Sequence, residues 1–238
     1  MGKGGYMRAF KVFALLVPVV LTISLAYAGK PKTGEYKAGI LADGKLNYTL
    51  HVADNWRVRT FDEPSVMRAL LIKKNYEVNR MVKDLGGDFT IPEIHIYARP
   101  DTTAPKAFLA RLQEEVQSHN SNDNIISKLD LLLSGEFIMM QETMIDSIPT
   151  VQALFKKNFT RRLEMDPNDA RYRQFGGMLA QNEHEVREIY IFSRDGWLFL
   201  IQAFAEREFY PVNQGEFQKI IGSLKFAKTA PTSPGDQY

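Results

Sequence analysis

The feature that most constrains the fold is a pair of apolar runs joined by a short polar turn. Residues 189–192 and 197–201 are apolar without a break, and an Asp-Gly dipeptide at 195–196 stands between them. A strand that is apolar on both faces is buried on both sides of its sheet. Asp-Gly between two such strands is the strongest short signal for a β-hairpin, and it sets Ser193 opposite Leu198. The sequence therefore predicts a central hairpin in an antiparallel sheet.

Two amphipathic helices are also predicted. Residues 105–119 repeat apolar side chains at helical spacing, after a cap expected within 101–103. A second helix is expected to begin at Asn213 as the cap, with Glu216 reaching back to it and Val212 stapled onto the buried face. The predicted buried faces consist of Phe108, Leu109, Leu112 and Val116 in the first helix, and Phe217, Ile220, Ile221 and Leu224 in the second.

Alternation of apolar and polar residues predicts further strands. In residues 45–61, KLNYTLHVADNWRVRTF, a three-residue turn at 53–55 would set Val52 opposite Trp56 and gather the polar side chains on the other face. Additional strands are expected at 66–73, at 90–98, and at 137–145 paired with 150–159.

The chain between residues 45 and 226 is predicted to form a single domain. Residues 29–44 are interpreted as a flexible leader, and residues 227–238 as a disordered tail. The stretch 160–185 has no sustained period and is interpreted as a loop with a short helix. Antiparallel strands buried on both sides, with two amphipathic helices to cover them, predict an α+β fold: an antiparallel β-sheet covered by helices on both faces, an α-β-α sandwich.

The N-terminus has the layout of a secretory signal peptide. Basic residues precede a largely apolar run of 14 residues, 12–25, which ends at Ala26-Tyr27-Ala28. A transmembrane anchor is the alternative, but the run is shorter than the roughly 17 to 25 residues that cross a bilayer. Cleavage is expected after Ala28, which predicts a periplasmic or secreted protein without stable membrane insertion.

Charge and cysteine content narrow the classes of partner. The chain has a net charge of +2, and cleavage would remove three basic residues, Lys3, Arg8 and Lys11. The remaining 27 basic and 28 acidic residues give a net charge of −1. This balance gives no argument for a nucleic acid partner. The sequence contains no cysteine, so no disulfide supports the fold and no cysteine nucleophile exists.

Several segments together resemble a known family. They are YTLHVADNWRV, a helix after IHIYARP, the hairpin YIFSRDGWLFLIQAFA and the closing FQKIIGSLKF. In these the chain resembles the PsbP-like α-β-α sandwich superfamily over about residues 45–226, and it departs from that pattern in 160–185. The resemblance implies a scaffold used for non-enzymatic binding or assembly. It transfers no functional residue, because a fold does not fix a function.

Histidines and hydrolase signatures give the enzymatic alternatives. His51 and His95 fall on predicted strands, and Glu93 shares a face with His95, so they could bind zinc or act as a base and its orienting group. No metal-binding spacing supports this, and structural histidines are favoured; His119 and His184 are the other two. A G-x-S-x-G elbow is absent, and GGDF at 86–89 is interpreted as a glycine turn.

Four arginines concentrate around the irregular stretch: Arg161, Arg162, Arg171 and Arg173. They are interleaved with acidic residues, which is typical of a solvated mixed surface. The alternative is a partner-binding loop, since arginine is a common interface anchor.

The sequence thus predicts an exported, non-enzymatic module that binds a protein or another envelope component and uses no cofactor or metal. A carrier of a small ligand (lipid, sugar or metal) is the alternative, and a hydrolase with a carboxylate pair is less favoured. The oligomeric state is left open.

Overall fold

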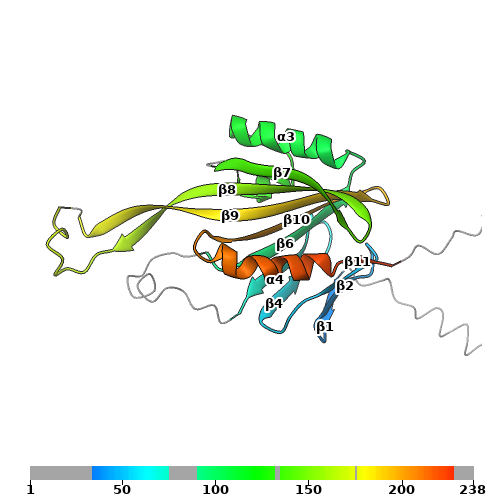
Figure 1. Ribbon diagram of the computed structural model, residues 1–238, viewed down its shortest axis with the longest axis horizontal. Coiled ribbons are helices and arrows are strands. Elements are labelled where there is room, and N and C mark those ends of the chain that lie inside the picture. The colour runs from blue at the N-terminus through cyan, green and yellow to red at the C-terminus, as the bar shows by residue number, and fades with distance from the viewer. Residues whose placement is uncertain (1–33, 75–89, 132–134, 175, 228–238) are drawn as a thin grey trace, which may run out of the picture. The chain divides into compact units, whose positions relative to one another are not determined.

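The computed structural model describes residues 34–74, 90–131, 135–174 and 176–227. Its strands form two antiparallel sheets (Figure 1). The larger sheet has seven strands, which in spatial order are β4 (Trp56–Thr60), β5 (Met67–Lys73), β6 (Glu93–Pro100), β10 (Trp197–Glu206), β9 (Met178–Arg194), β8 (Ile148–Glu164) and β7 (Gly135–Ile145).

The smaller sheet has four strands in the order β1 (Glu35–Lys37), β2 (Ile40–Asp43), β3 (Tyr48–His51) and β11 (Lys225–Phe226). It corrects two predictions. Residues 35–43, expected in a flexible leader, form β1 and β2, and Leu41 is 1% exposed. The hairpin expected within 45–61 is wrong, because β3 pairs with β2 and β11 while β4 pairs with β5. Alternation identified the strands and their faces, but it could not identify their partners.

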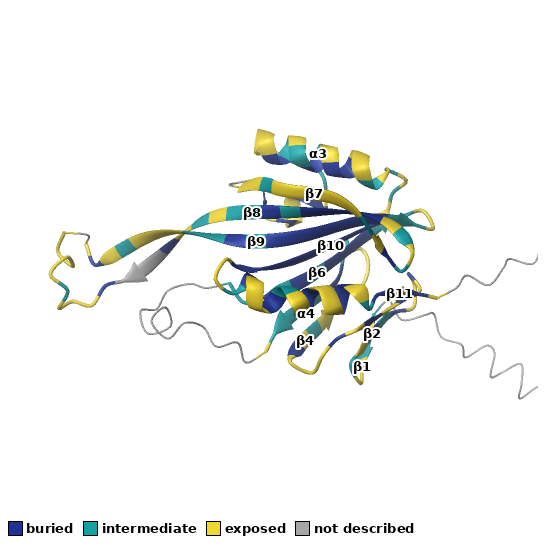
Figure 2. Ribbon diagram, in the orientation of Figure 1, coloured by how far each residue is buried: buried dark blue, intermediate teal, exposed yellow. Residues whose placement is uncertain are grey.

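The central hairpin is confirmed. Ser193 is paired with Leu198 across the turn, and the turn residues Asp195 and Gly196 both have positive φ, 49° and 77°. Every residue of β10 except Trp197 is buried (Figure 2). Trp197 packs against the core at the edge of the turn, as predicted.

Successive residues of β10 point into two separate cores. Leu200 belongs to the core that contains Phe108 of α3 (Pro105–Ser118), and Ile201 belongs to the core that contains Phe217 of α4 (Tyr210–Gly222). A short 3-10 helix, η1 (Ile126–Lys128), packs in the first core. The predicted α+β class with an antiparallel sheet is confirmed. The described residues are nevertheless mostly strand, and the second sheet was not predicted.

Both helices form where predicted, but they begin differently. Neither has a side-chain cap, and α4 starts near Pro211, a residue suited to the first helical turn. Asn213 is therefore inside the helix, where its Nδ2 donates to Phe209 O. Val212 is 83% exposed, so the predicted hydrophobic staple onto the buried face does not form. Glu216 accepts hydrogen bonds from Trp56 Nε1 and from Asn55 Nδ2, each at 2.9 Å, rather than closing a capping box.

The outer hairpin β7–β8 is confirmed, whereas the loop expected at 160–185 is wrong. β8 and β9 stay paired as far as Glu164 and Met178, so only the residues between them are irregular. Residues 158–184 pair with no other described strand, and we call this ribbon the arm (Figure 1). The residues of β9 in the arm, 178–184, are exposed or half-buried on both faces, which removes the apolar alternation by which strands are recognised.

Some predictions fall outside the described residues: the signal peptide 1–28, the GGDF turn at 86–89 and the tail from 228 onward. Among the residues that the structure describes, no helix is both long and apolar enough to cross a membrane.

Candidate functional site: an exposed edge strand beside an apolar cleft

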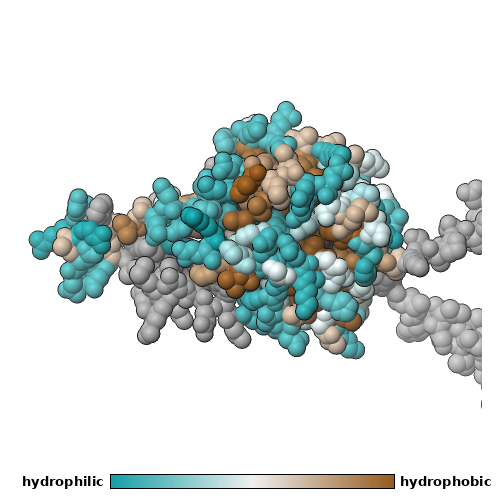
Figure 3. All heavy atoms as spheres, in the orientation of Figure 1, coloured by the Kyte–Doolittle hydropathy of each residue, from teal (hydrophilic) through white to brown (hydrophobic). Residues whose placement is uncertain are grey.

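β7 is an edge strand that keeps apolar side chains in water. It lies at one end of the seven-stranded sheet, and no described strand pairs with its outer edge. Of its eleven residues only Ile145 is buried. The exposed apolar side chains, by exposed fraction, are Ile138 (53%), Met139 (42%), Met140 (49%) and Met144 (58%). Figure 3 shows hydrophobic residues gathered over β7 below α3.

Both glutamates of β7 are paired with a lysine. Glu142 forms an ion pair with Lys106 at 2.6 Å, and Glu136 lies 3.6 Å from Lys156. By contrast, the short strand β4 at the other end of the sheet exposes Arg57 and Arg59. Charged edge residues prevent pairing with a foreign strand. The β7 edge is therefore the less protected of the two ends.

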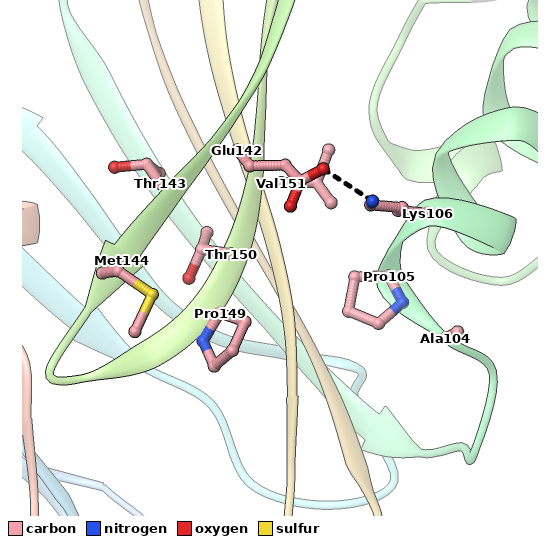
Figure 4. Close-up of a pocket in the computed structure, with 9 residues that line it drawn as sticks. All are labelled: Ala104, Pro105, Lys106, Glu142, Thr143, Met144, Pro149, Thr150 and Val151. Atoms are coloured by element: carbon pink, nitrogen blue, oxygen red, sulfur yellow. Dashed lines mark ion pairs between the residues drawn. The ribbon is translucent and has the colours of Figure 1, made fainter.

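A cleft of about 400 Å³ opens between the start of α3 and the β7–β8 hairpin (Figure 4). Residues 104–106, 142–144 and 149–151 line it, and most are apolar. The Lys106–Glu142 ion pair bridges the two walls. The volume lies within the range of about 300–1,000 Å³ that is common for binding pockets.

The α3 wall of the cleft is fixed by a cluster of ion pairs. Asp123 accepts from Arg99 and from Arg111, each at 2.7 Å, and Arg99 also donates to Asp101. Burial opposes the charge of Asp101, but hydrogen bonds from Thr103 and Arg99 outweigh it and lower its pKa to about 2. At Asp123 burial is likewise outweighed, by Arg99 and two backbone N–H groups, and its pKa is lowered.

The opposite wall is fixed through the turn of the outer hairpin. Asp146 and Ser147 have positive φ, 48° and 65°. The Asp146 carboxylate accepts from Phe226 N at 2.8 Å and from Lys225 Nζ at 3.0 Å. These partners lower the pKa of Asp146, chiefly through the backbone hydrogen bond. Both walls are thus held by ionised carboxylates, so the cleft is largely preformed.

The structure separates the four arginines that were predicted to bind a partner. Arg161 is 6% exposed at the base of the arm, with Nη2 2.5 Å from Glu206 Oε1. Arg171 and Arg173 are exposed in the tip, where Arg171 pairs with Asp169 at 2.9 Å. The side chain of Arg162 lies outside the described residues. Binding by this set stays a prediction, and Arg161 also has a structural role.

The histidine pair does not form. His51 is in the smaller sheet and His95 in the larger. His95 Nε2 lies 2.6 Å from Glu93 Oε2, and Nδ1 lies 3.0 Å from the Tyr97 hydroxyl. No group of three His, Cys, Asp or Glu side chains suited to a metal occurs among the residues described. Burial, then Lys156 and Arg207, lowers the pKa of His184.

Sequence reasoning missed the β7 site. The apolar letters of FIMMQETMI were visible, and the hairpin was predicted, but the order of strands in the sheet was not. A strand offers unpaired backbone groups to a partner only when it lies at the edge of its sheet. The Met139-Met140 and Met144 pattern is the one signal in the sequence that could have suggested it.

Comparisons with known proteins give distant structural matches only. No family model matches the chain, and no curated protein matches its sequence. The solution structure of cyanobacterial PsbP (CyanoP) from Synechocystis sp. PCC 6803 is similar at 8% identity and a TM-score of 0.45, covering 84% of this chain and 96% of that one. LpqN, involved in cell envelope biogenesis of Mycobacterium tuberculosis, is similar at 10% identity and a TM-score of 0.42, covering 84% and 88%.

A protein of unknown function from Pseudomonas aeruginosa is similar at 9% identity and a TM-score of 0.39, covering 74% of this chain and 99% of that one. The PsbP match names the same superfamily that the sequence resembles. All three TM-scores lie below 0.5.

Proposed function

We propose that this chain is an exported, non-enzymatic binding module that adds an extended segment of a partner protein to the outer edge of β7. The observation that carries the proposal is an eleven-residue end strand with exposed apolar side chains beside a preformed apolar cleft. Addition of a strand to an exposed sheet edge is an established mode of peptide recognition.

The chemistry of the edge favours a polypeptide as the occupant. An edge strand presents a row of main-chain N–H and C=O groups, and another backbone can satisfy that row in full. The carboxylates of Glu136 and Glu142 each have a lysine partner, which weakens the repulsion that an incoming acidic strand would otherwise meet. A partner therefore needs an extended backbone segment with apolar side chains. It does not need a positive charge to offset the glutamates of β7.

A second copy of the chain fits this edge less well than a foreign segment. The pairing of β7 with β8 shifts between Phe137 and Met139, which marks a bulge at Ile138. If two β7 strands paired antiparallel, the first half of each strand, which contains the bulge, would lie opposite the second half of the other strand, which is regular. A regular strand from another protein meets no such mismatch.

Peptide selection combined with hydrogen exchange tests the proposal. The purified protein is used to select binders from a displayed library of random peptides, and the amides protected by each peptide are then mapped. We expect slower exchange along β7, because an added strand removes its outer N–H groups from water. Met140→Lys is expected to weaken binding at least about tenfold, since lysine on an edge blocks strand addition.

Val212→Lys is the matched control, because Val212 is an exposed apolar residue outside the sheet. It should leave binding unchanged. Binders that protect another surface, or no binders at all, would contradict the proposal. A dimer in sedimentation that Met140→Lys dissociates would show that the added strand comes from a second copy, and would overturn the foreign partner.

A small-ligand carrier is the second candidate, and the apolar cleft is the observation that favours it. The same experiment separates the two. A lipid-like molecule held in the cleft would stabilise the protein against heat. It would not protect the outer amides of β7, because it has no backbone to offer them.

A further inference from the structure

We infer that the cleft is a specificity pocket for one large apolar side chain, of leucine or phenylalanine size, on the strand added to β7. The inference rests on the proposed function and deepens it, because it names the residue chemistry that the module selects. In strand addition the main chain supplies affinity, and pockets for alternate side chains supply specificity.

The alternation of β7 places the cleft beside one set of positions on the added strand. Met140 is paired with Ala153 and Glu142 with Val151, and both partners belong to the core that contains α3. Glu142 and Met144 therefore face α3 and border the cleft, whereas Gln141, which bonds Gln152 at 2.7 Å, faces the other way. Side chains directly opposite on neighbouring strands lie about 4.5–5.5 Å apart at Cβ. A residue opposite Glu142 or Met144, on the same face, therefore projects beside the cleft.

The chemistry of the walls selects an apolar group. Among the described residues that line the cleft, only Lys106 and Glu142 are charged, and they already pair with each other at 2.6 Å. An incoming charge would lie against Pro105 and Val151 without a partner of its own, and such burial is unfavourable. A leucine or phenylalanine side chain has no charge to desolvate there, and its burial removes apolar surface from water.

The preformed walls make the pocket selective rather than adaptable. One wall is held by the Asp101 and Asp123 cluster, and the other by Asp146 bound to Phe226 N. A side chain too small to fill the space, such as alanine, forfeits contacts that the walls cannot restore by collapsing. We therefore expect discrimination by size as well as by polarity.

The test fills the pocket from an exposed position. Ala104 lines the cleft and is exposed, so Ala104→Phe occupies the space without altering the core. Ala110→Phe is the matched control, because Ala110 is exposed on α3 and does not line the cleft. Each variant is titrated with a β7-protecting peptide and with the same peptide carrying alanine at its large apolar position.

We expect Ala104→Phe to weaken the large-residue peptide at least about tenfold and to leave the alanine peptide nearly unchanged, while Ala110→Phe changes neither. If Ala104→Phe leaves the preference for the large residue intact, the pocket inference is wrong although strand addition stands. If no peptide protects β7 at all, the proposed function itself fails, so the two failures are distinguishable.

Discussion

The central hairpin β9–β10 and the outer hairpin β7–β8 are built from the same local elements and differ in their surroundings. Both have a two-residue turn with positive φ, at Asp195-Gly196 and at Asp146-Ser147. Nine of the ten residues of β10 are buried, whereas one of the eleven residues of β7 is. Apolar side chains are therefore buried in β10 of the first hairpin and left exposed in β7 of the second.

This difference shows that the position of a strand in the sheet, rather than its apolar content, decides whether its side chains are buried. Phe199 of β10 stacks on Phe192 with ring centroids 5.0 Å apart, deep in the core. Met140 of β7 has a side-chain contact with Gln113 and is otherwise half exposed. An apolar side chain stabilises the fold in one place and stays half exposed to water in the other.

Phe199→Ala is expected to have the largest effect on stability. Truncation of a buried aromatic side chain costs about 3–5 kcal/mol, and Phe199 is 2% exposed. Met140→Ala in the outer hairpin should cost about 0.5 kcal/mol or less, as exposed substitutions usually do. Urea unfolding of the two variants measures both values. Equal losses would show that the outer hairpin belongs to the core as fully as the central one.

Arg161→Met tests how much the ion pair near the base of the arm, where β8 and β9 extend beyond the rest of the sheet, contributes to stability. The change leaves Glu206, which is also buried, without its arginine. Breaking a buried ion pair costs about 3 kcal/mol or more. Arg171→Met in the exposed tip is the control and should change the free energy of unfolding by about 0.5 kcal/mol at most. A small loss at Arg161 would mean that the ion pair at the base of the arm is dispensable.

Acid should affect the cleft wall and spare the central hairpin. Because the folded pKa of Asp101 is about 2, below its ordinary value, its contribution to stability is complete above about pH 4 and is lost as the pH falls towards 2. Asp101→Asn should therefore cost up to about 1 kcal/mol at pH 7, after solvent screening, and almost nothing at pH 2. Hydrogen exchange in acid should show α3 losing protection before β10 does. Simultaneous loss would contradict a local effect.

The sequence predicted those elements whose signals are local. The Asp-Gly turn and two-sided burial specified the β9–β10 register, and helical spacing identified the buried face of α4. The pairing of β3 with β4 failed because alternation says which face a residue occupies and nothing about the neighbouring strand. Asn213 was misjudged as a cap because Pro211, just before it, starts the helix earlier.

The candidate site could not be predicted in the same way. The cleft joins residues 104–106 to residues 142–151, two segments that meet only because β7 ends the sheet near α3. The four arginines predicted to form a binding loop carry no information on burial in the sequence, and Arg161 is buried and forms ion pairs with acidic residues of β9 and β10. Edge positions and long-range ion pairs depend on the whole topology.

The arm has a practical consequence for experiments on this chain. From Asn158 to His184 the two strands pair only with each other among the described strands, and exposed residues such as Asn168 occupy the tip. A foreign sequence inserted there would interrupt no pairing of the seven-stranded sheet, and exposed tips of this kind tolerate insertion. The tip is therefore a natural attachment point for a dye or an affinity tag, and one that leaves both the β7 edge and the chain termini untouched.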